Sequence, residues 1–166
     1  MKSLLTILLS TMIPLVCSAD DAEEAKSMID ALKKYRAALV GGQTAEAVAL
    51  TAEFPGLPAE AIKGETQGYV NAASSGDLKL WIFPTSARVI GSCGVLIIGD
   101  GEEPDADDPA YMIEQDDGWK VLLELTNWNE PYFKLSEDQK KAFQKLEVHV
   151  AEQKKELRAA SNPKAE

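Results

Sequence analysis

The sequence is poor in the residues that build metal centres and disulfide frameworks. It has one histidine and two cysteines, too few of the usual ligands for a zinc site. It is also short of positive charge, because 17 basic residues face 27 acidic ones and the formal net charge is −10. Such a chain repels phosphate backbones, so we expect no nucleic-acid partner. The sequence gives no reason to expect a cofactor either.

Long apolar runs are absent except at the N-terminus, where residues 4–16 are almost continuously apolar. Lys2 precedes this run, and residues 17–19 offer small side chains where a signal peptidase cuts. The run is shorter than the roughly 20 residues that a membrane-spanning helix needs. The pattern predicts a cleavable signal peptide over residues 1–19, export to the periplasm or the medium, and no membrane span after cleavage. The alternative is a buried N-terminal helix.

Cleavage would leave Cys93 as the only cysteine of the mature chain, which excludes an internal disulfide bond. The remaining length suits one ordinary domain with a real hydrophobic core. We expect this domain over residues 20–133, a C-terminal helix over residues 134–160 and a flexible tail over residues 161–166.

Hydrophobic periodicity divides the mature chain into a helical part and a sheet part. Three- and four-residue spacing predicts helices over residues 21–40 and 44–53 and a third from Pro58 onward. After Gly76 the pattern changes, and alternation with turn residues predicts an antiparallel meander. Its expected strands are residues 78–83 (ended by Pro84 or lying at a sheet edge), 88–98, 111–115 and 119–128, with a tight turn at residues 116–118.

Ser136 begins the last predicted helix, and Gln139 three residues later completes a capping-box pattern. Residues 134–166 have a small excess of basic side chains, whereas residues 20–133 are strongly acidic. We therefore expect this helix to dock on its own acidic domain or on a second copy, which would give a homodimer.

The segment Tyr-Met-Ile-Glu-Gln-Asp-Asp-Gly-Trp-Lys-Val at residues 111–121, preceded by Ser-Ala-Arg-Val at residues 86–89, resembles a hairpin of the nuclear-transport-factor-2-like superfamily. The resemblance, to its SnoaL-like and ketosteroid-isomerase-like members, covers residues 22–128. It implies an α+β cone in which N-terminal helices and a curved antiparallel sheet enclose one pocket, here followed by a long C-terminal helix. Some members of that superfamily are isomerases, dehydratases or hydrolases, and others bind ligands without chemistry.

The enzymes among these cones use a carboxylate base beside a phenol or acid. The corresponding catalytic candidates are Glu124 and Tyr111, and the alternative is that Glu124 faces solvent while the tyrosines pack in the core. Aromatic residues of the sheet and helices could also line an apolar pocket, although aromatic side chains are more often core. The pocket candidates are Tyr35, Tyr69, Trp81, Phe83, Cys93, Tyr111 and Trp128.

One acidic segment could supply oxygen ligands for Ca²⁺, although its spacing does not fit an EF-hand loop and we expect no metal. Its candidate ligands are Asp100, Glu102, Asp105, Asp107 and Asp108. A solvated loop is the alternative. We expect a small exported, non-enzymatic domain that binds a small apolar ligand or a protein partner through an apolar pocket. The alternative is an isomerase, dehydratase or hydrolase that uses a carboxylate and a tyrosine of the pocket.

Overall fold

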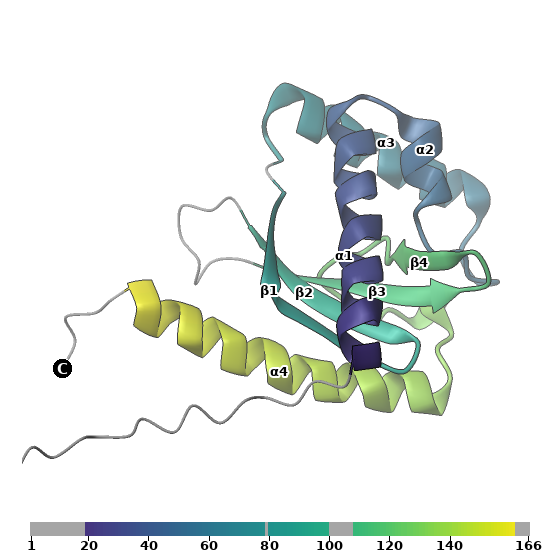
Figure 1. Cartoon of the computed structure of the whole chain (residues 1–166). Helices are drawn as coiled ribbons and strands as arrows, with labels where there is room; N and C mark the ends of the chain where they lie inside the picture. Colours follow the sequence, from purple (N-terminus) through teal and green to yellow (C-terminus); the bar gives the residue numbers. More distant parts are fainter. Residues whose placement is uncertain (1–18, 79, 100–107, 162–166) are drawn as a thin grey trace, which may run out of the picture.

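The computed structural model describes residues 19–78, 80–99 and 108–161 of the chain. The fold is α+β, as predicted: a curved four-stranded antiparallel sheet with helices before it and a long helix after it (Figure 1). Among the described residues, no helix is both long and apolar enough to span a membrane. In chain order the elements are α1 Ala19–Val40, α2 Thr44–Ala49, α3 Ala59–Ser75, β1 Trp81–Ile90, β2 Cys93–Gly99, β3 Asp108–Gln115, β4 Gly118–Val121, the 3-10 turn η1 Pro131–Phe133 and α4 Glu137–Ser161.

The second helix is shorter than predicted, since α2 ends at Ala49 rather than near Glu53. The chain leaves the helix to pair with the sheet. The amide of Ala52 donates to Val121 O at 2.8 Å, and the amide of Val121 donates to Leu50 O at 2.9 Å. These two bonds attach the segment after α2 to strand β4, and they set the position of the loop that leads into α3.

Strand β1 lies at the sheet edge, in the order β1-β2-β3-β4, and runs through Pro84 instead of stopping there. Its register with β2 shifts between Phe83 and Arg88. Within the shift the Ser86 hydroxyl donates to Phe83 O and accepts from the amide of Ile97, both at 2.7 Å. A side chain thus continues the ladder through the irregular stretch around proline, which has no N–H to donate. The strand predicted over residues 88–98 is in fact two strands, which turn at Gly91 with φ 57°.

The last predicted strand, residues 119–128, is also too long, because β4 ends at Val121. Beyond it the chain bends across β3: the amide of Leu122 donates to Tyr111 O at 3.1 Å, and the amide of Tyr111 donates to Leu125 O at 2.8 Å. Alternation is lost there, since Leu122, Leu123 and Leu125 are all buried. Glu124 therefore lies in a bend and not in a strand.

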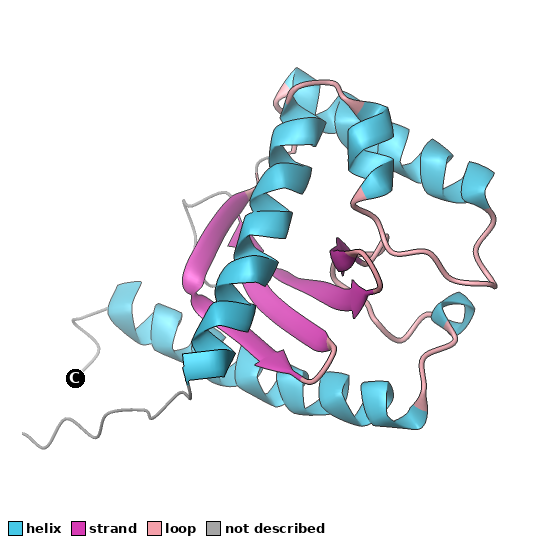
Figure 2. Ribbon diagram, turned by 45° about the vertical axis from the view of Figure 1, so that its right-hand side comes forward, coloured by secondary structure: helices cyan, strands magenta, loops and turns pink. Residues whose placement is uncertain are grey.

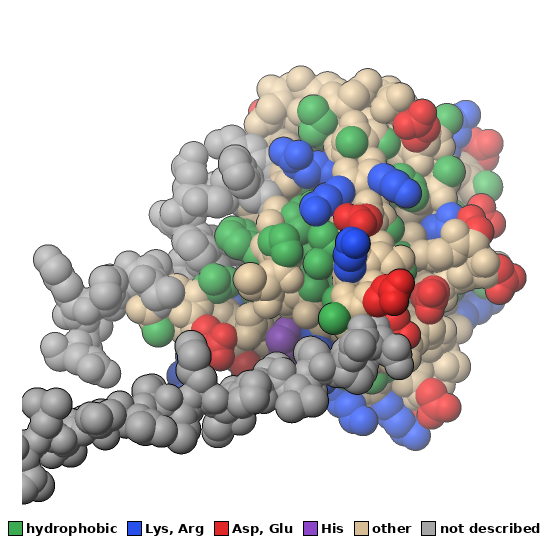
Figure 3. All heavy atoms as spheres, viewed as in Figure 1, with side chains coloured by type: hydrophobic (Ala, Val, Ile, Leu, Met, Phe, Trp, Pro, Cys, Tyr) green, Lys and Arg blue, Asp and Glu red, His purple; other side chains and the backbone are tan. Residues whose placement is uncertain are grey.

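The sheet separates two hydrophobic clusters, one under the N-terminal helices and one under α4 (Figures 1 and 2). Helix α4 packs on β1 and β2 through Phe143, Leu146 and Val150, which are buried. The predicted capping box begins it: the Ser136 amide donates to Gln139 Oε1 at 2.9 Å, and the Gln139 amide donates to Ser136 Oγ at 3.2 Å. Figure 3 shows hydrophobic side chains gathered beside α1 on the face in view.

Candidate functional site

An apolar groove lies between α2 and the start of α3. Its volume is about 400 Å³, and most of its lining is apolar. The loop that forms one wall turns between the two helices, where the amide of Leu57 donates to Phe54 O at 2.9 Å. Pro58 then caps α3 in an extended conformation. The lining residues are Val48, Glu53, Phe54, Pro55, Leu57, Ala59 and Ile62.

The aromatic wall of the groove, Phe54, packs against a second segment, the 3-10 turn η1. The ring of Phe54 lies 5.1 Å from that of Phe133, and the Phe133 ring lies 4.7 Å from that of Tyr132. Gly56 permits this approach, since a Cβ at that position would be only 2.9 Å from Tyr132 O. Figure 2 shows the loop before α3 and the loop before α4 on the same side of the molecule. Tyr132 thus lies directly beside the groove.

Around Tyr132 the fold collects two phenols and three carboxylates, which we call the tyrosine–carboxylate cluster: Glu65, Tyr69, Glu124, Glu130 and Tyr132. Burial is the main reason that the pKa of Tyr132 rises to about 12. The neighbouring carboxylates act in the same direction, in the order Glu124, Glu130 and Glu65. Burial, followed by Glu124 and Glu65, also raises the pKa of Tyr69. Both phenols therefore keep their protons at neutral pH and can donate hydrogen bonds.

Two buried hydroxyls lie in the packed N-terminal helices, those of Tyr35 and Thr66. Tyr35 and Thr66 are 0% exposed. Neither hydroxyl makes a well-aligned hydrogen bond within the described residues, but the Thr51 hydroxyl lies close enough to that of Tyr35 to lower its pKa. Burial, and after it the neighbouring Tyr69, raises the pKa of Tyr35. The Thr51 hydroxyl, which lowers that pKa, donates its own proton to Ala47 O at 3.1 Å. Buried polar atoms without partners are rare in native proteins and call for a water or a ligand.

The structure places Glu124 with Tyr69 and Tyr132, not with Tyr111. The side chain of Tyr111 lies on the α4 side of the sheet, where its ring meets Phe143 edge-on at 5.7 Å. Burial, with a smaller effect of Glu147, raises the pKa of Tyr111 to about 12. Glu124 is not among the groups that act on the Tyr111 phenol, so the two catalytic candidates of the sequence do not form a pair.

The predicted pocket residues do not form one pocket. Cys93, Tyr111 and Trp128 are buried in the cluster under α4. Tyr35 belongs to the cluster under the N-terminal helices, and Tyr69 packs against it. Phe83 is half-buried on β1. Trp81 is the first residue of β1, and its side chain lies outside the described part.

Four of the calcium candidates, Asp100, Glu102, Asp105 and Asp107, lie outside the described residues. The fifth, Asp108, begins β3, and its carboxylate lies 4.0 Å from the Lys154 ammonium. Within the described residues, no group of three histidine, cysteine or acidic side chains could hold a metal ion.

A larger hollow of about 620 Å³ lies between the end of α2 and the β3–β4 turn. Its lining is mostly polar, and its one basic group, Lys120, is already paired. The ammonium donates to Ala49 O and to Asp117 Oδ2, both at 2.6 Å. Glu53 lines both this hollow and the apolar groove.

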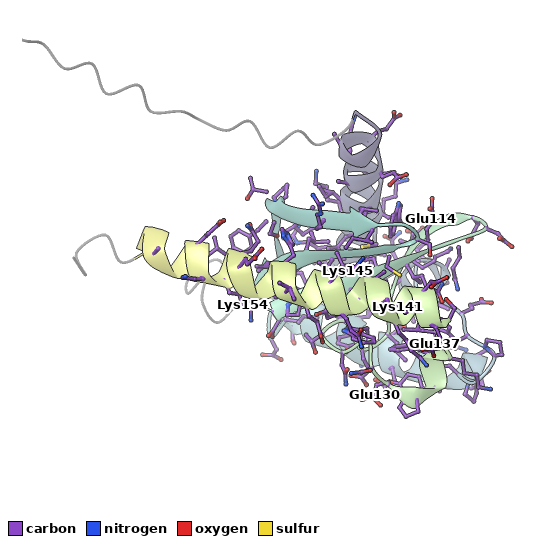
Figure 4. All side chains as sticks on the ribbon, turned by 90° about the horizontal axis from the view of Figure 1, so that it is seen from below. Glu114, Glu130, Glu137, Lys141, Lys145 and Lys154 are labelled. Atoms are coloured by element: carbon purple, nitrogen blue, oxygen red, sulfur yellow. The ribbon has the colours of Figure 1, made fainter. Side chains whose placement is uncertain are left out.

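The outer face of α4 carries charges of both signs. Figure 4 shows Glu137, Lys141 and Lys145 spaced along it. Lys140 lies 2.8 Å from Glu137, and Lys141 lies 3.8 Å from Asp138. Pairs within one exposed helix contribute little to stability or recognition. Docking of α4 on its own domain rests on apolar burial, and the homodimer stays a prediction.

The residues that build the groove and its cluster were missed by sequence reasoning, except for Glu124 and Tyr69. The predicted helix ends left a connection before Pro58, but nothing local indicated that this loop reaches Tyr132. Comparison of the chain with protein-family models, with curated proteins and with solved structures finds no match in any of the three. The resemblance to the nuclear-transport-factor-2-like superfamily therefore stays a prediction.

Proposed function

We propose that this chain is a non-enzymatic binding domain that holds a small, mainly apolar molecule in the groove of Phe54, Leu57 and Ile62. The observation that carries the proposal is the groove itself. It is a mainly apolar hollow with a volume of about 400 Å³. Ligand sites are typically concave and mainly apolar, with a few polar groups at one end. The tyrosine–carboxylate cluster, which includes Tyr132, would supply those polar groups.

A substitution that fills the groove tests this proposal. Ala59 lies in the lining at the start of α3, so Ala59→Phe would occupy the space that a ligand needs. Ala61, which is exposed on the same helix and outside the lining, gives the matched control Ala61→Phe. Methyl NMR of Leu57 and Ile62 would follow a panel of fatty acids, steroids and aromatic compounds. We expect saturable shifts in the wild type and in Ala61→Phe, and none in Ala59→Phe. Shifts that survive Ala59→Phe, or a panel without any effect, would rule the groove out.

An isomerase, dehydratase or hydrolase is the second candidate. It is favoured by Glu124, a carboxylate that acts on the two protonated phenols Tyr69 and Tyr132. A carboxylate base next to a phenol donor is the arrangement that enolate chemistry requires. Turnover of unsaturated ketones or esters that Glu124→Gln abolishes, while ligand shifts at Ile62 persist, would establish this candidate. Turnover that is indifferent to Glu124→Gln would exclude it.

We also propose that the chain is exported and loses residues 1–19. The support is the order of charged, apolar and small residues at the N-terminus. Expression in a bacterium with a general secretory pathway should yield a protein that begins at Asp20, as intact mass spectrometry would report. An uncleaved protein that stays in the cytoplasm would contradict the proposal.

A further inference from the structure

The loop between α2 and α3 builds one wall of the groove. More than half of the lining residues lie in it, namely Glu53, Phe54, Pro55 and Leu57. Within residues 53–57 the structure shows a single backbone hydrogen bond, which the Leu57 amide donates to Phe54 O at 2.9 Å. The position of this wall therefore depends on contacts with other elements of the fold.

Backbone pairing with the sheet stops just before the wall begins. Thr51 forms an isolated parallel bridge with Val121 of β4, and the Ala52 amide donates to Val121 O at 2.8 Å. From residue 53 to residue 57, no backbone group bonds to a backbone group of another element in the described part of the chain. The end of the neighbouring strand β3 supplies a side chain at this point instead.

The side chain is that of Gln115, the last residue of β3. Its Nε2 donates to Glu53 O at 2.8 Å, and its Oε1 accepts from the Glu53 amide at 3.2 Å. A primary amide carries a donor and an acceptor, as a peptide group does, so Gln115 continues the pairing of the segment by one residue. Within the described ranges, these are the only two hydrogen bonds that join residues 53–57 to another element.

Gln115 reaches the groove only through the loop. It does not line the groove itself but lines the polar hollow, and Glu53 borders both spaces. Any effect of Gln115 on a ligand in the groove must therefore act through the position of Glu53 and of the wall that follows it. Glu53 is exposed and Gln115 is half-buried. Bonds in such a solvated position contribute modestly to global stability, so order in the loop is separable from stability of the fold.

We infer that Gln115 is a positioning residue of the groove, which keeps the Phe54 wall in its binding conformation by pairing with the backbone of Glu53. This inference rests on the proposed function, because it names what controls the order of the wall that would contact the ligand. The apparent affinity of a site falls in proportion to the population of its binding conformation. Packing of the Phe54 ring on Phe133, at 5.1 Å, still limits the movement of the wall. We therefore expect Gln115→Ala to weaken binding about three- to tenfold.

The test uses N-phenyl-1-naphthylamine, a neutral dye whose fluorescence rises in apolar surroundings. Its dissociation constant would be measured for the full chain, for Gln115→Ala and for the control Glu114→Ala. Glu114 is the exposed neighbour of Gln115 on β3, and adjacent residues of a strand point to opposite faces. The control should bind as the wild type does. Gln115→Ala should bind about three- to tenfold more weakly, while the urea midpoint of unfolding hardly moves.

Hydrogen exchange of the ligand-free protein gives a local readout that needs no ligand. The Glu53 amide bonds to Gln115, whereas the Ala52 amide bonds to Val121 O. In Gln115→Ala the Glu53 amide should exchange about tenfold faster, because it loses its partner. The Ala52 amide should keep its rate. Equal acceleration at both amides would mean that the whole segment is loosened, and it would overturn the specific role of Gln115.

Gln115→Glu gives a rescue that a side chain acting by its volume alone would not show. At pH 7 the introduced carboxylate accepts from the Glu53 amide but has no hydrogen to donate to Glu53 O. Protonation of the carboxyl group, which has an ordinary pKa of about 4.3, restores that donor. The affinity of Gln115→Glu for the dye should therefore rise relative to Gln115→Ala as pH falls from 7 to 4. Parallel pH profiles of the two variants would contradict the pairing.

The outcomes separate this inference from the proposed function. Dye binding that is lost in Ala59→Phe but unchanged in Gln115→Ala would overturn the role of Gln115 and leave the groove as a binding site. Where the dye does not bind, the panel compound that shifts Ile62 takes its place. No binding of the dye or of any panel compound to the wild type would overturn the proposed function together with this inference.

Discussion

The two sides of the sheet differ in how completely their polar groups are paired. Under α4, the indole of Trp128 stacks on Phe143 at 5.5 Å and donates to Glu147 Oε1 at 2.9 Å. Under the N-terminal helices Thr66 is equally deep, yet its hydroxyl finds no partner in the described part of the chain, and the buried Tyr35 hydroxyl has only the Thr51 hydroxyl beside it.

This difference indicates a division of roles. An unsatisfied buried polar group costs about 1–3 kcal/mol, and a chain bears that cost only when other interactions offset it. The aromatic cluster under α4 is well suited to do so, because its large side chains, such as Phe143 and Trp128, are buried and packed on one another. We therefore expect stability to depend mainly on the closed centre of the α4 side, around Phe143, and binding to depend on the groove, whose Phe54 wall packs against the edge of that cluster.

The largest effect that tests this division is the loss of Phe143. Its ring contacts both Trp128 and Tyr111 and is 0% exposed, so Phe143→Ala should lower the free energy of unfolding by about 3–5 kcal/mol. The exposed neighbour Gln144 gives the control Gln144→Ala, with an expected change within about 0.5 kcal/mol. Urea unfolding followed by Trp fluorescence measures both. A cost below about 1 kcal/mol for Phe143→Ala would mean that the α4 side is not the main source of stability.

A smaller loss is expected at Gly94, on the helix side of β2. A Cβ here would overlap Met28 Sδ and lie 3.1 Å from the Trp119 ring, so Gly94→Ala should cost about 1–3 kcal/mol through overpacking. The double variant with Met28→Ala makes room for the methyl group. It should therefore be less destabilised than the sum of the two single variants, as double-mutant unfolding experiments would show. Strict additivity would contradict the close approach of α1 to β2.

The features that sequence reasoning predicted well are local ones. The long first helix follows from buried residues such as Met28 and Leu32 at helical spacing. The capping box at Ser136 and the two-residue turn before Gly118 depend on neighbours within three positions. These signals, together with the change of period after Gly76, were enough to give the α+β class and the antiparallel meander.

The errors and omissions arise from contacts between distant segments. Strand β1 passes Pro84 because the Ser86 hydroxyl bonds the amide of Ile97 on the next strand. Strand β4 ends early because Leu122 turns to pair with Tyr111. The candidate site joins segments near residues 54, 65, 124 and 132, which only the tertiary fold brings together. Alternation had placed Glu124 in a strand, and no local pattern indicated that Tyr132 is its neighbour.

Removal of single hydroxyls sharpens the comparison between paired and unpaired groups. Ser86 is buried and bonded twice through its side chain, and its carbonyl lies 2.9 Å from His149 Nε2 of α4. Ser86→Ala should therefore cost about 1–3 kcal/mol, since two backbone groups lose their partner. Thr66→Val removes a hydroxyl without a partner in the described residues, and Tyr35→Phe removes one with only the Thr51 hydroxyl beside it, so both should leave stability unchanged or raise it by up to about 1 kcal/mol. Urea unfolding at pH 7 gives all three values. A loss above about 1 kcal/mol for Tyr35→Phe would show that its hydroxyl is bonded after all.

The smallest expected effect is a loss of stability at alkaline pH that comes from the Cys93 thiol on the α4 side. Burial raises the pKa of this thiol from 9.0 to about 11, and a hydrogen bond from Ser92 lowers it slightly. Because the folded pKa lies above the unfolded one, the contribution to stability is complete below about pH 9 and is lost as pH rises through about 11. The free energy of unfolding should thus fall more steeply in the wild type than in Cys93→Ala over this range, and iodoacetamide should react slowly with the native thiol at pH 8. Equal slopes, together with rapid alkylation of the native protein, would show that solvent reaches the α4 side and that it is not the closed half of the molecule.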